Sequence, residues 1–176
     1  MKRYSEGAIS YVFPDSFVVL RLEDSAYYRG FWQTFAQAQG KDGNKECDFI
    51  ALDPANGALW LLETKDYRHE TRTKPSELGY EFAAKCRDSI GCLAAMKMSP
   101  FAPAEEKELI LQLFKAKKIR CVIHIEQGVR SKLFPAVIDP KILRDCLRRQ
   151  LRPLDPHAIG GDATLLEGQI PFDIVL

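Results

Sequence analysis

The sequence predicts an α/β fold in which a mixed central β-sheet is flanked by helices. Two apolar runs, Cys47–Leu52 and Ala58–Lys65, lie on either side of strong turn residues and predict a β-hairpin. Helical patterns precede and follow this hairpin. A third apolar run, Arg120–Ile125, is typical of a buried strand. The chain has 176 residues, which fits one domain over 1–176.

Composition and charge limit the possible function classes. Hydrophobic residues make up 46% and charged residues 28% of the chain, with a net charge of +1, so any nucleic-acid binding must rely on local patches. The five cysteines have no CxxC spacing and indicate reduced thiols, with neither a disulfide framework nor a zinc site. No apolar leader and no run of eighteen apolar residues is visible. We therefore expect a cytoplasmic protein with no membrane contact.

The remaining elements follow from periodicity and capping residues. Short strands are expected over Ile9–Phe13 and Phe17–Leu22, followed by a helix over Ser25–Gln39 that Asp24 or Ser25 caps. A second helix is expected to begin at Ser76 and to end before Pro100. Further helices are expected over 104–118 and 141–152, and a last strand over 172–176. His124 is interpreted as a core histidine.

The hairpin also carries the chemistry. If it closes on Pro54–Gly57, Asp48 faces Glu63 directly, and Lys65 lies on the same face of the sheet. Two opposed carboxylates repel unless a cation lies between them, and Mg²⁺ prefers carboxylate oxygens. An acidic pair beside a lysine suits metal-assisted hydrolysis of a phosphodiester.

Asp48 followed by Glu63-Thr64-Lys65 resembles the active-site motif of the PD-(D/E)xK nuclease superfamily, which includes restriction endonucleases and Holliday-junction resolvases. The resemblance covers about residues 46 to 98. It departs from the usual pattern because Cys47, and no proline, precedes the first acid, and because the preceding helix has no obvious glutamate.

The resemblance implies a restriction-endonuclease-like fold and a nuclease that acts on DNA more readily than on RNA. Asp48, Glu63 and the backbone carbonyl of Thr64 would bind Mg²⁺ or Mn²⁺, and Lys65 would orient the attacking water. Lys85, from the following helix, is the best further candidate. Oligomeric state stays open, a homodimer included. A basic loop after the hairpin could hold phosphates through its cations, Arg68, Arg72 and Lys74.

Several alternatives remain open. Glu63 and Lys65 could form an ordinary ion pair on an edge strand, and Lys85 could pair with Asp88 or Glu81 along its own helix. The basic loop could be a solvated connector. A third metal ligand could come from Glu23, Gln33 or Gln37. The whole chain could also be a non-catalytic interaction or nucleic-acid-binding module that keeps a nuclease-like fold.

Overall fold

A computed structural model describes residues 1–34, 44–69, 77–128 and 138–176. At its centre lies a five-stranded sheet with the order β3-β4-β5-β6-β7, and beside it a three-stranded sheet with the order β1-β2-β8. The central strands are β3 (Val18–Leu20), β4 (Phe49–Asp53), β5 (Ala58–Tyr67), β6 (Lys118–Gln127) and β7 (Ile159–Gly161). The smaller sheet consists of β1 (Lys2–Glu6), β2 (Ile9–Phe13) and β8 (Asp173–Val175).

The predicted hairpin is present with the predicted register. Phe49 pairs with Leu62, and Asp53 pairs with Ala58. The Asp53 carboxylate accepts hydrogen bonds from the backbone of the turn. Gly57 has a φ of +60°, a conformation that glycine adopts without strain. Turn chemistry therefore sets which residues face each other across β4 and β5.

The central sheet is mixed, as expected. β4 runs antiparallel to both β3 and β5. β6 runs parallel to both β5 and β7. β5 lies in the middle of the sheet, and its first seven residues are buried. β5 is therefore not an edge strand of the sheet, although its pairing with β4 ends at Leu62, and the ion pair between Glu63 and Lys65 that the alternative expected is present.

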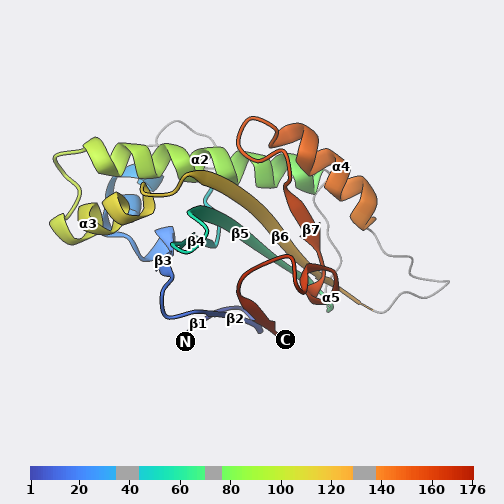
Figure 1. Cartoon of the computed structure of the whole chain (residues 1–176). Helices are drawn as coiled ribbons and strands as arrows, with labels where there is room; N and C mark the ends of the chain where they lie inside the picture. The colour runs from blue at the N-terminus through green and yellow to red at the C-terminus, as the bar shows by residue number, and fades with distance from the viewer. Residues whose placement is uncertain (35–43, 70–76, 129–137) are drawn as a thin grey trace.

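Helices cover one face of the central sheet (Figure 1). The long helix α2 (Leu78–Met98) crosses this face, with α4 (Pro140–Gln150) beside it and α3 (Ala104–Leu113) near its other end. Leu59 and Leu61 of β5 pack in the same buried cluster as Phe82 and Leu93 of α2. Alternation along β5 then turns Glu63 and Lys65 toward α2 as well.

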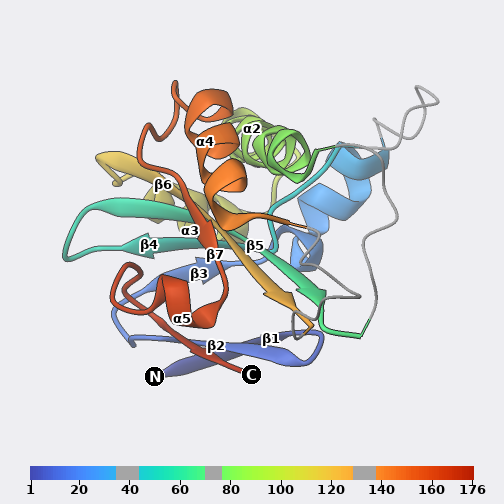
Figure 2. The same ribbon diagram turned by 90° about the vertical axis from the view of Figure 1, so that its right-hand side faces the viewer.

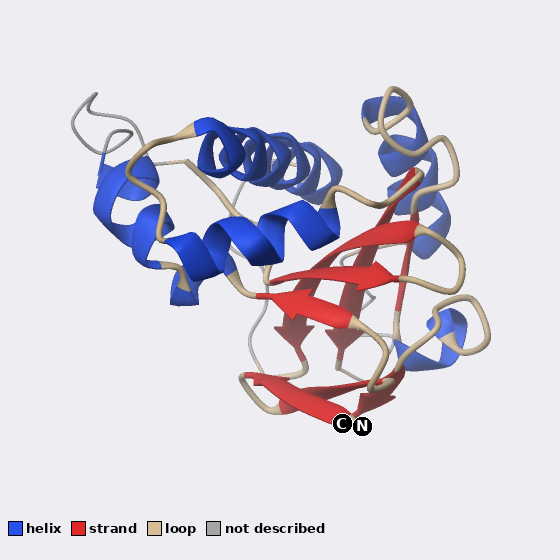
Figure 3. Cartoon of the chain, turned by 60° about the vertical axis from the view of Figure 1, so that its left-hand side comes forward, coloured by secondary structure: helices blue, strands red, loops and turns tan. Residues whose placement is uncertain are grey.

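The small sheet covers the opposite face, as the perpendicular view in Figure 2 shows. Trp60 and Leu62 of β5 share a second buried cluster with Tyr11 and Phe13 of β2. Strand β8 pairs with β2, so both chain termini lie on this small sheet (Figure 3).

Several predicted boundaries were wrong, for identifiable reasons. The first residue before α2 is Glu77, without a side-chain cap, and Ser76 lies outside the described residues. Helix α3 ends at Leu113, because the backbone N–H groups of Lys117 and Lys118 donate to the Gly57 carbonyl and lead into β6. Within the described residues, sequence periodicity did not reveal β1, β7 or the short helix α5 (Ala163–Leu166).

The first helical region contains an irregularity. Residues Tyr28–Trp32 form a π-helical segment, η2, after a short 3₁₀ turn, η1 (Leu22–Asp24). Its start is capped as predicted, since the Tyr28 N–H donates to Ser25 Oγ over 3.0 Å. The Glu106 carboxylate of α3 accepts a further N–H from Ala26. The predicted end of this helix, at Gln39, lies outside the described residues.

Candidate active site

Asp48 is held in place by contacts of the residues before it with α2 and by a contact of its own carboxylate with β5. Just before it, the Lys45 N–H donates to Asp88 of α2, and the Cys47 N–H donates to Ser89 Oγ over 2.9 Å. The Asp48 carboxylate then accepts the Thr64 backbone N–H, with Oδ2 at 2.6 Å. Because α2 anchors the segment that enters β4, the first acid is fixed at the point where the β4–β5 ladder ends.

Glu63 lies one residue before this contact and is 1% exposed. Its Oε1 atom accepts from two ammonium groups: Lys65 of the same strand, and Lys85 of α2 at 2.6 Å. Lys85 Nζ also lies 3.9 Å from Asp48 Oδ1. The predicted approach of Lys85 is therefore confirmed, and its partners are the two acids and not Asp88, which binds the Lys45 backbone.

The charges in this cluster influence one another strongly. Burial, and then the charge of Asp48, raise the pKa of Glu63, while Lys65 and Lys85 oppose that change. Burial alone would lower the pKa of Lys85, but the charge of Glu63 and the hydrogen bond between them outweigh burial and raise it. The site thus holds a compact set of two acids and two ammonium groups, largely shielded from water.

The donor set fits a hard cation with few protein ligands. Glu63 Oε2 is buried and has no hydrogen-bond partner among the described residues. The Thr64 carbonyl lies on the same edge of β5 as the Thr64 N–H that binds Asp48, since both groups of one residue point to one side of a strand. Within the described ranges, no three His, Cys, Asp or Glu side chains gather into a metal site. Water would have to supply the remaining ligands of such an ion.

The other predicted site residues do not reach this cluster in the described part of the chain. Glu23 pairs with Arg21, and its side chain is about half exposed. Arg68 pairs with Asp66 through two hydrogen bonds, at 2.9 and 2.7 Å, so its guanidinium is already engaged. Gln33 is partly buried, and no hydrogen bond joins its side chain to the described residues of the cluster. Three candidates, Gln37, Arg72 and Lys74, lie outside the described residues.

A third acid near the site, Glu6, was not predicted from the sequence as a site residue. It ends β1, and its Oε2 accepts from Arg21 Nη2 at 2.9 Å. Burial, and then the charge of Asp48, raise the pKa of Glu6, while Arg21 and Lys65 lower it. No spacing in the sequence links residue 6 to the hairpin, since β1 belongs to the other sheet. Only the packing of the two sheets brings this carboxylate into the field of Asp48.

A buried chain of hydrogen bonds leads away from Thr64 on the opposite face of β5. Tyr11 Oη lies 2.8 Å from Thr64 Oγ1 and 2.7 Å from His124 Nδ1. His124 Nε2 lies 2.8 Å from Glu126 Oε1. Burial lowers the pKa of His124, which favours the neutral ring. With Nε2–H donating to Glu126, Nδ1 accepts from Tyr11, and the prediction of a core histidine is confirmed.

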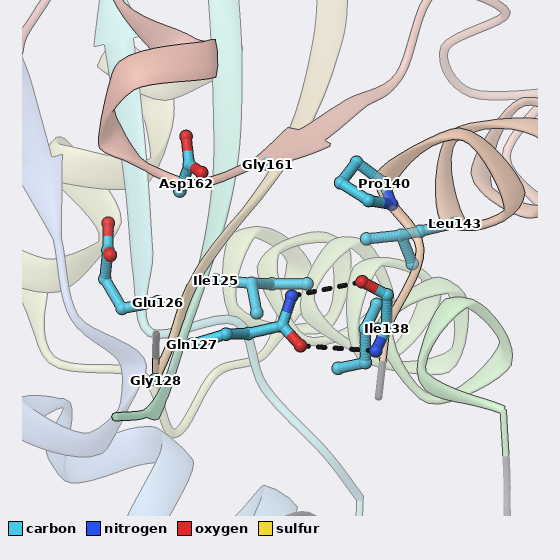
Figure 4. A pocket seen from close by; sticks show the side chains of 9 residues that line it. All are labelled: Ile125, Glu126, Gln127, Gly128, Ile138, Pro140, Leu143, Gly161 and Asp162. Atoms are coloured by element: carbon cyan, nitrogen blue, oxygen red, sulfur yellow. Dashed lines mark hydrogen bonds between the residues drawn. The ribbon is translucent and has the colours of Figure 1, made fainter. Parts of the chain in front are cut away.

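A separate hollow opens where β6 and β7 end, beside the start of α4 (Figure 4). Glu126 and Asp162 lie along it, but both carboxylates have partners. Glu126 Oε1 accepts from His124 and from the Ala163 N–H, and Asp162 Oδ1 accepts the Leu165 N–H. The side-chain amide of Gln127 donates to the Ile138 carbonyl and accepts from the Ile138 N–H. Unlike the Asp48–Glu63 cluster, the described residues around this hollow include no buried carboxylate oxygen without a hydrogen-bond partner.

A scan against protein-family models found no match, and searches of curated proteins and of solved structures found none either. Among the described helices, none combines the length and the apolar character needed to cross a bilayer. The assignment of function therefore depends on the chemistry of the site.

Proposed function

We propose that this protein is a metal-dependent nuclease that hydrolyses phosphodiester bonds in DNA and has a restriction-endonuclease-like fold. The observation that carries the proposal is the Asp48–Glu63–Lys65 cluster at the end of a buried hairpin, with the orphan Glu63 Oε2 atom inside it. A buried carboxylate oxygen without a partner is costly, and an oxygen-seeking cation would satisfy it. The mixed sheet with helices on one face supports the same assignment.

Asp48, Glu63 and the Thr64 carbonyl would hold Mg²⁺ or Mn²⁺, which supplies Lewis-acid stabilisation of charge at phosphorus. Lys65 Nζ, on the same strand face, would orient the attacking water by hydrogen bonding. The Asp88 and Ser89 contacts keep the segment before Asp48 in place, so the acids need little rearrangement.

The test is a cleavage assay on duplex, branched and single-stranded DNA and on RNA, with Mg²⁺, Mn²⁺ or Ca²⁺. The parent should cut at least one DNA form with Mg²⁺ or Mn²⁺. Asp48→Asn, Glu63→Gln and Lys65→Ala should each reduce the rate by at least about a hundredfold, the scale of one lost charge-stabilising group. Glu108→Gln, at an exposed position of α3, is the matched control. Equal cleavage by all four variants would refute the site.

A non-catalytic module is the second candidate. One observation favours it: both acids already have cationic partners in the form of lysines. Such a protein would bind nucleic acid or another partner without any metal-dependent change in melting temperature, whereas an ion that binds only the folded state raises it.

A further inference from the structure

We infer that Lys85 occupies the cation position between the two acids and competes with the divalent ion for it. This inference rests on the metal site that the proposed function assumes, and it specifies how that site is regulated. Lys85 comes from α2, whereas the acids come from the hairpin, so the competitor belongs to a different element from its partners. The sequence alone predicts that Lys85 approaches the site, and it does not predict this competition.

The contacts define the shared position. Lys85 Nζ lies 2.6 Å from Glu63 Oε1 and 3.9 Å from Asp48 Oδ1. The other oxygen of Asp48, Oδ2, is taken by the Thr64 N–H. The Asp48 oxygen left for a metal is therefore the one that faces the Lys85 ammonium. Lys65, by contrast, forms an ion pair with Glu63 and none with Asp48.

Both cations cannot hold this position at once. A divalent ion on the two open oxygens, Asp48 Oδ1 and Glu63 Oε2, would lie about 2.0–2.1 Å from each. It would then be within a few ångströms of the Lys85 ammonium, which contacts Asp48 Oδ1 and the other oxygen of Glu63. Repulsion between a double and a single positive charge at that distance, in a poorly hydrated site, is large. Entry of the ion therefore requires the Lys85 side chain to leave Glu63.

The Lys85 side chain is exposed enough to move away from Glu63. The Lys85 side chain is 22% exposed, while that of Glu63 is 1% exposed, so the lysine lies at the mouth of the site and the acid at its base. A flexible four-carbon stem lets the ammonium swing outward without moving α2.

The experiment titrates each protein with Mn²⁺ alone and measures the free ion by its electron paramagnetic resonance spectrum. Lys85→Met keeps the length of the side chain and removes its charge. It should bind Mn²⁺ at least about tenfold more tightly than the parent, equivalent to about 1.4 kcal/mol. Lys85→Arg keeps the charge and should not show this gain. Arg87→Gln removes a charge from an exposed position of the same helix and should match the parent.

Circular dichroism of each variant establishes that it is folded, and Lys85→Gln, which also removes the charge, replaces Lys85→Met if that variant does not fold. If Lys85→Met binds Mn²⁺ no more tightly than the parent, or if Lys85→Arg gains as much as Lys85→Met, the inference is wrong. Absence of Mn²⁺ binding in every protein would also overturn it. A gain in Lys85→Met, together with no cleavage by the parent on any substrate, would leave the inference standing and remove the proposed function.

Discussion

At the scale of single residues, the sequence predicted which charged side chains gather at the site but not which atoms of these side chains contact one another. A four-residue turn fixes the register of β4 and β5, whose last pair is Phe49 with Leu62, so the sequence could place Asp48 and Glu63 next to each other just beyond that pair. That two ammonium groups would meet on one oxygen of Glu63 depends on how α2 packs, which local pattern does not encode. The two lysines consequently oppose the repulsion between the acids, although the pKa of Glu63 stays raised.

The pKa of Glu63 decides how neutralising this acid should change stability. Burial and the charge of Asp48 outweigh Lys65 and Lys85 and raise that pKa, so the ionised carboxylate is less favourable in the folded protein than in the unfolded chain. Glu63→Gln should therefore raise the free energy of unfolding of the metal-free protein at pH 7, by about 1 kcal/mol, the upper range for a cross-strand pair. Urea denaturation without metal measures it, with the exposed Glu108→Gln as control. A loss of stability would mean that the contacts from Lys65 and Lys85 outweigh burial and repulsion.

At the scale of elements, strands with a clear apolar or alternating pattern were predictable, whereas β1 and β7 were not. β2 matches its predicted bounds, because alternating residues and a Pro14 turn mark it clearly. β7 has three residues, two of them glycine, and no pattern could distinguish it from a loop. A side chain on Gly160 would lie 2.8 Å from Ile123, so this glycine serves close packing against β6. Such a requirement comes from tertiary structure alone.

The hydrogen-bonded chain across β2, β5 and β6 makes stability depend on pH. Burial lowers the folded-state pKa of His124 below its ordinary value of 6.5. As pH falls below 6.5, the unfolded chain therefore takes up a proton first. Stability present above that pH is then lost, by up to about 1.4 kcal/mol per pH unit, until the folded-state pKa is reached.

Urea denaturation of the parent and of His124→Gln between pH 5 and 8 measures this loss as a difference between the two proteins. Carboxylates such as Glu63 titrate in both and cancel in that difference. The parent should lose stability relative to the variant as the solution becomes more acidic. Parallel profiles would show that His124 does not titrate differently on unfolding.

At the scale of the whole molecule, the fold depends on joining the two ends of the chain. β8 pairs with β2, so the last residues complete a sheet that the first residues begin. That sheet covers the face of β5 opposite α2, and it carries Tyr11, which contacts Thr64. The sequence indicated a strand near the C-terminus, but its partner could not be predicted because the two strands lie more than 150 residues apart in the chain.

Phe172 connects this closure to the core and gives a direct test of it. Its ring, 5% exposed, lies 4.7 Å from that of Phe13 and 5.9 Å from that of Trp60, measured between centroids. Phe172→Ala should therefore lower the free energy of unfolding by about 3–5 kcal/mol, as expected for a large cavity in a packed core. Val175→Ala, at a position 38% exposed on β8, the strand that follows Phe172, should change it little. Urea denaturation compares them, and if Phe172→Ala were as stable as Val175→Ala, the C-terminal strand would not be part of the cooperative core. If the small sheet does support the site through Tyr11 and Thr64, Phe172→Ala should also weaken Mn²⁺ binding, whereas Val175→Ala should leave it unchanged.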